Sequence, residues 1–152
     1  MYEIEGEYDS AVSLYEELLK KNPGLDIAIN NLATVLTEHY TDDDKLKKAV
    51  QLTEKFKDSD QNFYKDTYAW ALIKQGSVNE GLRILNQIIA ISPDVPVFRY
   101  HLGIAHYENG NSSSAINDIK QALELEKKYG NFSDKKEAEK LLEEIVAKTR
   151  GY

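Results

Sequence analysis

Small residues recur along this chain at nearly constant intervals, and this regularity constrains the fold more than any other feature. They stand at Ala11, Ala49, Gly81 and Ala115, separated by 38, 32 and 34 residues. In three of the four copies a glycine lies five positions earlier, as at Gly6. Intervals of this size are typical of arrays in which one small unit of structure is repeated. The sequence therefore predicts a helix–turn–helix repeat of about 34 residues.

The composition favours helices throughout, with abundant Ala, Leu, Glu and Lys and only three prolines. Pro23 and Pro93 each lie twelve residues after a small residue of the repeat, where proline ends one helix and allows the next to begin. We predict helices over 8–21, 26–39, 45–57, 62–75, 78–91, 96–109, 112–127 and 134–148, with 1–5 as the end of an earlier helix. The repeat that contains residues 40–44 is longer than the other repeats, and we expect this segment to be a surface loop.

Short motifs within the repeats carry a family resemblance. Leu102-Gly103 is followed three residues later by His106, in a position that usually holds an aromatic ring, and Leu32-Ala33 and Tyr68-Ala69 are weaker versions. Small residues in these positions allow paired helices to cross closely. Over nearly all its length the chain resembles a tetratricopeptide-repeat array, and more narrowly the C-terminal repeats of long bacterial proteins of that family. The resemblance implies an all-α, right-handed superhelix of antiparallel helical hairpins.

The implied organisation is a single domain over 1–152. It comprises a partial repeat over 1–25, repeats over about 26–61, 62–95 and 96–129, and a capping helix over about 133–149. The last helix has apolar residues at helical spacing and a charged opposite face, as a solenoid end requires. Its apolar positions are Leu141, Leu142, Ile145 and Val146.

The N-terminal end has no comparable cap. We expect the chain to be a piece of a longer array, with Met1 as an added initiator. The helix over 8–21 would then expose Val12, Tyr15 and Leu19. Because a contiguous apolar patch tends to find a partner, we expect self-association through this open end.

The resemblance also implies that the first helix of each hairpin lines a concave face where ligands lie. From the register, the candidate peptide-binding residues are Asn30, Asn31, Thr34, Asp66, Thr67, Trp70, Tyr100, His101 and Tyr107. Large aromatic side chains are favoured at interfaces, and the asparagines could bond a peptide backbone. The alternative is that Trp70 and Tyr100 pack between neighbouring helices.

One subfamily holds the C-terminal carboxylate of a chaperone peptide with Lys, Arg and Asn side chains in the groove. Asn31 matches one Asn position of that clamp. The other corresponding positions hold no cation: they are Asn30, Thr34, Phe63 and Thr67. A carboxylate clamp is therefore not expected.

Charge and composition exclude several other functions. With 19 Lys+Arg against 26 Asp+Glu, the net charge is −7, which argues against binding to nucleic acid. The absence of Cys removes disulfides and thiolate sites, and His101 and His106 lack the four-residue spacing of a helical metal pair. No apolar run reaches the roughly 18 residues that span a membrane. No catalytic group, metal or cofactor is predicted.

We therefore predict a non-catalytic scaffold that binds a peptide or protein segment in its concave groove. The alternative is a purely structural spacer within a longer array. No signal peptide is visible at the acidic start of the chain, and cytoplasm and periplasm both remain open.

Overall fold

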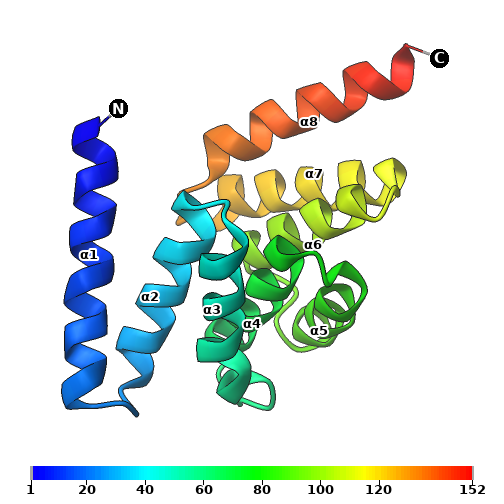
Figure 1. Cartoon of the computed structure of the whole chain (residues 1–152). Helices are drawn as coiled ribbons and strands as arrows, with labels where there is room; N and C mark the ends of the chain where they lie inside the picture. Colours follow the sequence, from blue (N-terminus) through cyan, green and yellow to red (C-terminus); the bar gives the residue numbers. More distant parts are fainter. Residues whose placement is uncertain (1, 152) are drawn as a thin grey trace. The chain divides into compact units, whose positions relative to one another are not determined.

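The computed structural model describes residues 2–151, with side chains from Gly6 onward. Within this part of the chain the regular secondary structure is entirely helical, in agreement with the predicted all-α class (Figure 1). The elements are α1 (Tyr2–Lys21), α2 (Asp26–His39), α3 (Asp43–Thr53), the 3-10 turn η1 (Glu54–Phe56), α4 (Asn62–Gln75), α5 (Val78–Ile91), α6 (Pro96–Glu108), α7 (Ser112–Tyr129) and α8 (Lys135–Arg150).

Three helices, α2, α4 and α5, have the predicted bounds. Their ends are set by local chemistry that can be identified in the sequence. At the end of α4, Gly76 has φ 106° and its N–H bonds the carbonyl of Ile73 at 3.0 Å, while the N–H of Ser77 bonds that of Leu72 at 2.8 Å. A glycine takes this left-handed conformation without steric cost and so closes the helix.

The predicted starts of α1 and α3 are wrong, and other bounds of α3, α6, α7 and α8 differ from the prediction by one to four residues. Gly6 lies inside the continuous helix α1 and not in a turn; a helix tolerates an isolated glycine at a cost of about 1 kcal/mol. The helix predicted to begin at Lys45 begins at Asp43, because Asp42 is its N-cap and accepts a 3.1 Å hydrogen bond from the Lys45 N–H. The extra residues of this repeat thus build the first turn of α3 as well as a loop. The prediction about Met1 lies outside the described residues.

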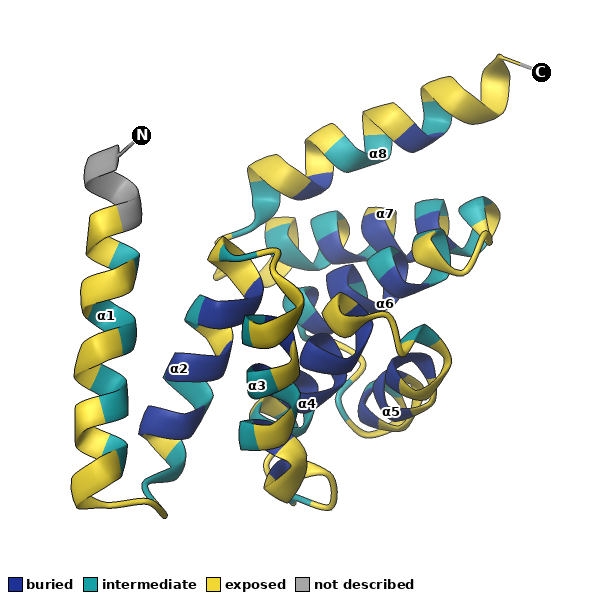
Figure 2. Cartoon of the chain, in the orientation of Figure 1, coloured by how far each residue is buried: buried dark blue, intermediate teal, exposed yellow. Residues whose placement is uncertain are grey.

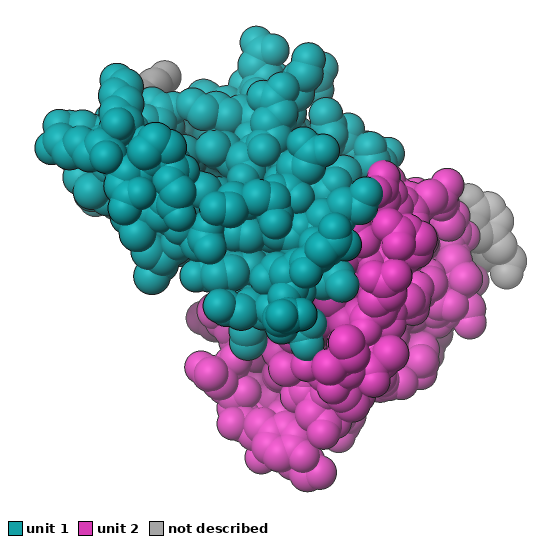
Figure 3. All heavy atoms as spheres, turned by 90° about the horizontal axis from the view of Figure 1, so that it is seen from below, with its two compact units in different colours: residues 1–77 teal, residues 78–152 magenta. Residues whose placement is uncertain are grey.

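The chain divides into two compact units, residues 1–77 and 78–152, coloured in Figure 3. In the first unit, α2 contributes the fully buried Leu32 and Leu36, and Figure 2 shows buried stretches along this helix. Val12, Tyr15 and Leu19 of α1 pack against them and are partly buried. Their predicted exposure is therefore wrong, because the side of α1 that carries them faces α2.

The exposed apolar side chains of α1 lie elsewhere on that helix. Leu14 is 56% exposed and Leu18 is 38% exposed. They stand four residues apart and therefore share one face of the helix. The large apolar side chains that α1 exposes are thus Leu14 and Leu18 and not the predicted Val12, Tyr15 and Leu19.

The second unit is built around the close pairing of α6 and α7. Gly103 of α6 lies against α7, so that a Cβ at this position would stand 2.8 Å from Cγ1 of Ile119. This agrees with the argument that small residues allow the paired helices to cross. Helix α8 covers α7 with the fully buried Ala138 and Ile145, and its opposite face is exposed (Figure 2).

Candidate peptide-binding face

Two side-chain hydrogen bonds join α2 and α4 within the first unit. The Thr67 hydroxyl donates to Oδ1 of Asn30 at 2.7 Å, and Nε1 of Trp70 donates to Oε1 of Glu38 at 2.8 Å. The partners occur in the same order along both helices, so α2 and α4 run in the same direction. Asn30 and Thr67, predicted from the register to share a face, are thus brought together.

Two large apolar side chains are exposed one turn before this contact. Ile27 precedes Asn30 by three residues and is 59% exposed, and Phe63 precedes Thr67 by four and is 64% exposed. Residues three or four apart lie on the same side of a helix, so both stand beside the Asn30–Thr67 bond. Large exposed apolar groups beside polar ones are the usual composition of a binding surface.

We call this surface the α2–α4 face. It is defined by its partly or fully exposed residues on the two helices, which are Ile27, Asn30, Asn31, Thr34, Glu38, Phe63, Thr67 and Lys74. Ile27 and Phe63 are not among the residues that the register predicts to bind a peptide. Both lie in the first turn of their helices, but this position alone does not signal exposure, since Ala28 and Ile29 in the first turn of α2 are buried.

Trp70 lies beneath this face and not on it. Its exposed fraction is 7%, and its N–H is bonded to Glu38 as a buried indole requires. The Nζ of Lys74 stands 5.2 Å from the ring centroid, in cation–π geometry. This environment favours the packing alternative for Trp70, and its use as a binding anchor stays a prediction.

The other predicted residues of the first unit differ in accessibility. Asn31 is partly exposed and Thr34 is exposed, with the Thr34 hydroxyl donating to the carbonyl of Asn30 at 2.9 Å. Asp66 is only 5% exposed. A partner could therefore contact Asn31 and Thr34 directly, whereas Asp66 would need a side-chain rearrangement.

Tyr100, His101 and Tyr107 belong to α6 in the second unit. Tyr100 is 8% exposed and packs edge-on against Phe132, with ring centroids 5.5 Å apart; His101 is 6% exposed. Tyr107 is partly exposed, and its hydroxyl accepts a 3.0 Å hydrogen bond from Nζ of Lys148 on α8. This bond raises the pKa of Lys148 above its ordinary value. All three aromatic rings are thus engaged in packing within their own unit.

The side chains of the α2–α4 face can bind but show no catalytic arrangement. Their chemistry is that of apolar contact, amide and hydroxyl hydrogen bonding, one exposed carboxylate at Glu38 and one exposed ammonium at Lys74. In the described part of the chain, no group of three His, Asp or Glu residues is placed to hold a metal ion. No helix of the described residues combines the length and apolar character needed to cross a bilayer.

Comparison with known proteins identifies the fold. No protein-family model matches the chain, and no curated protein matches it. Several solved structures, in contrast, are similar to this chain. TTC0263, a thermophilic TPR protein in Thermus thermophilus, is 19% identical with a TM-score of 0.76, covering 97% of this chain and 77% of that one.

Two further solved structures are also similar to this chain. MamA 41-end from Desulfovibrio magneticus RS-1 is 18% identical with a TM-score of 0.65, over 83% of this chain and 70% of that chain. A tetratricopeptide repeat protein from Parabacteroides merdae ATCC 43184 is 18% identical with a TM-score of 0.65, over 95% and 67%. The chain therefore has the all-helical repeat fold of the tetratricopeptide-repeat proteins.

Proposed function

We propose that this protein is a non-catalytic scaffold that binds an extended or helical segment of a partner on its α2–α4 face. The observation that carries the proposal is the exposure of Ile27 and Phe63 beside the Asn30–Thr67 contact. These two residues supply the apolar area from which a binding site gains most of its energy. Asn31 and Thr34 supply polar groups that a peptide backbone can bond.

Charge indicates the chemistry of the partner. Residues 1–77 hold 9 Lys+Arg and 15 Asp+Glu, a net charge of −6, whereas residues 78–152 hold 10 and 11, a net charge of −1. The unit that carries the α2–α4 face is thus the acidic one, while the face itself holds one charge of each sign, on Glu38 and Lys74. An apolar segment flanked by Lys or Arg is the complementary partner, and its binding should weaken as salt rises.

The test is selection of binders from a library of random displayed peptides, followed by affinity measurement. Phe63→Ser should weaken binding of the selected peptides at least about tenfold, as expected for a central apolar anchor. The matched control is Ile91→Ser, since Ile91 is 72% exposed but lies on α5; it should bind like the parent. Equal affinities of the two variants would contradict the proposal.

The same selection addresses the alternative that the chain is a structural spacer. A spacer needs no ligand, so it should yield no peptide that distinguishes the parent from Phe63→Ser. If the library returns no specific binder, the spacer is the better description of the chain.

A further inference from the structure

A small pocket lies in the first unit, where α1 meets the end of α2 and the start of α3. It has a volume of about 170 Å³ and is lined by Tyr8, Asp9, His39, Tyr40 and Lys45. Tyr8 and His39 are stacked, with ring centroids 3.5 Å apart and ring planes 11° from parallel. The hydroxyl of Tyr40 donates a hydrogen bond to Oδ1 of Asp9. We call this the Asp9 pocket; it brings aromatic rings and a carboxylate together.

The charges of the pocket leave one carboxylate available. The Nζ of Lys45 stands 3.9 Å from the centroid of the Tyr40 ring, in cation–π geometry, and 3.6 Å from Oδ2 of Asp42. Asp42 balances the charge of Lys45, which is the only Lys or Arg among the described residues that line the pocket. With His39 neutral at pH 7, the negative charge of Asp9 remains. The pocket therefore suits a cation that comes from a partner.

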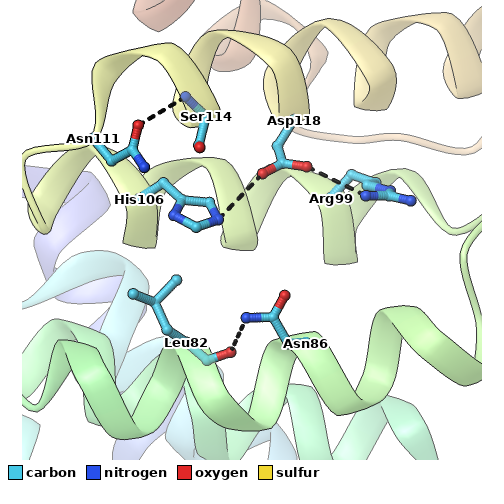
Figure 4. Close-up of polar contacts among 7 residues, drawn as sticks. All are labelled: Leu82, Asn86, Arg99, His106, Asn111, Ser114 and Asp118. Atoms are coloured by element: carbon cyan, nitrogen blue, oxygen red, sulfur yellow. Dashed lines mark hydrogen bonds and ion pairs between the residues drawn. The ribbon is translucent and has the colours of Figure 1, made fainter.

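Asp9 differs in this respect from the buried carboxylate of the second unit. Asp118 is 6% exposed, and its oxygens stand 3.3 Å from Nη1 of Arg99 and 3.6 Å from Nε2 of His106 (Figure 4). That carboxylate already holds a guanidinium of the same chain. Asp9 is exposed, and a carboxylate has about four lone-pair sites. It can therefore bind a guanidinium while it keeps its bond from the Tyr40 hydroxyl.

The Asp9 pocket lies at the end of a helix that carries the α2–α4 face. His39 directly follows Glu38, the last α2 residue of that face, and stands twelve residues after Ile27. Twelve helical residues span about 18 Å, which an extended segment covers in about five or six residues. A segment whose apolar residue contacts Ile27 can thus place a long side chain in the pocket.

We propose that the Asp9 pocket binds an arginine side chain of the partner segment, about five or six residues from the apolar residue that contacts Ile27 and Phe63. The inference rests on the proposed function, and it specifies which basic residue the partner carries and where. Arginine suits the pocket better than lysine, because its planar guanidinium stacks on aromatic rings and its fork of donors matches a carboxylate. Tyr40 offers the first kind of contact and Asp9 the second.

Binding of the side chain alone is tested without any peptide. N-acetyl-arginine amide is titrated into the isotopically labelled full chain, and chemical shifts are followed by NMR. The largest shifts should fall on Tyr8, Asp9, His39 and Tyr40. N-acetyl-citrulline amide, which has a similar shape but no charge, should cause none there. Shifts that are absent from the pocket, or that are the same for both compounds, would overturn the proposal.

A matched pair of variants separates the pocket from general attraction between charges. Asp9→Asn should abolish the response to N-acetyl-arginine amide. Asp43→Asn makes the same change at an exposed carboxylate that does not line the pocket, and it should respond like the parent. Equal responses of the two variants would count against the pocket.

Lys45→Gln distinguishes a ligand pocket from a purely structural contact. Lys45 competes with the ligand for the ring of Tyr40, so its removal should raise the affinity for N-acetyl-arginine amide about twofold to fivefold, the size of an exposed cation–π contact. A purely structural role predicts no such gain. An affinity that falls or stays the same would contradict the proposed competition and with it the pocket.

A peptide from the displayed library connects the pocket to the proposed function. Its arginine is replaced by glutamine, and the loss of affinity is measured on the parent and on Asp9→Asn. The loss should be at least about threefold larger on the parent. Equal losses, or selected peptides without arginine at this spacing, would refute the pocket even if Phe63→Ser still weakens binding. If N-acetyl-arginine amide binds at Asp9 but no peptide depends on Phe63, the pocket is supported and the proposed function fails.

Discussion

Adding one methyl group at Gly103 tests the close crossing of α6 and α7. A Cβ there would stand 2.8 Å from Cγ1 of Ile119, and 3.3 Å from the Ala115 carbonyl oxygen and the Ile119 backbone nitrogen. The Ile119 side chain is fully buried and has little room to move, and the two backbone atoms can move only with helix α7. The helices must therefore separate by several tenths of an ångström, or Ile119 must leave its rotamer.

Two opposing effects set the size of the change. Replacing a mid-helix glycine by alanine stabilises the helix by about 1 kcal/mol. Overpacking a core typically costs about 1–3 kcal/mol, and the two backbone contacts place this site toward the upper end. We expect Gly103→Ala to lower the free energy of unfolding by about 1–2 kcal/mol and the melting midpoint by about 3–6 °C.

The matched control is Gly6→Ala, because Gly6 also lies within a helix but a Cβ there would meet nothing within 4 Å. Only the propensity gain operates at that site, so the variant should be more stable than the parent by about 0.5–1 kcal/mol. Urea unfolding followed by circular dichroism measures both. If Gly103→Ala is as stable as Gly6→Ala, the crossing is not as close as described and the reasoning fails.

Three further outcomes follow from the structure. Trp70→Ala should destabilise the chain by about 3–5 kcal/mol in urea unfolding, because it empties a buried site and leaves Glu38 without its indole donor; an unchanged midpoint would place Trp70 on the surface. Asp42→Ala should cost about 1 kcal/mol in the same assay through loss of the N-cap bond to Lys45, and a neutral result would show that the cap does not hold α3. Leu14→Glu should weaken self-association measured by light scattering at high concentration, since Leu14 is exposed on α1; a parent chain that is strictly monomeric would contradict this.

The repeat period and the Pro and Gly residues between the helices predict most of the fold. The bounds of α2, α4 and α5 follow from apolar spacing and from Pro and Gly at the turns, which are local signals. Gly6 misleads because glycine marks a turn only when the neighbouring residues do not continue the helix. Asp42 is ambiguous in the sequence because its role as a cap depends on whether the backbone turns before or after it.

The candidate face is less predictable than the helices. Register alone places Ile27, Phe63 and Trp70 on the same side of their helices, but it does not decide which of them is covered. The long indole of Trp70 lies under the face and reaches Glu38, whereas Phe63 lies in a first turn and remains exposed. Burial depends on how neighbouring helices pack, and the spacing of apolar residues along a single helix does not contain that information.

Binding of a partner segment to the α2–α4 face can be observed residue by residue through NMR chemical-shift mapping. A peptide selected from the library is added to the isotopically labelled chain, and the shifted signals are assigned. We predict that the largest shifts cluster on Ile27, Asn31, Thr34 and Phe63, and that these shifts shrink when salt is added. Shifts that cluster on other helices, or that leave Ile27 and Phe63 unchanged at saturation, would contradict it.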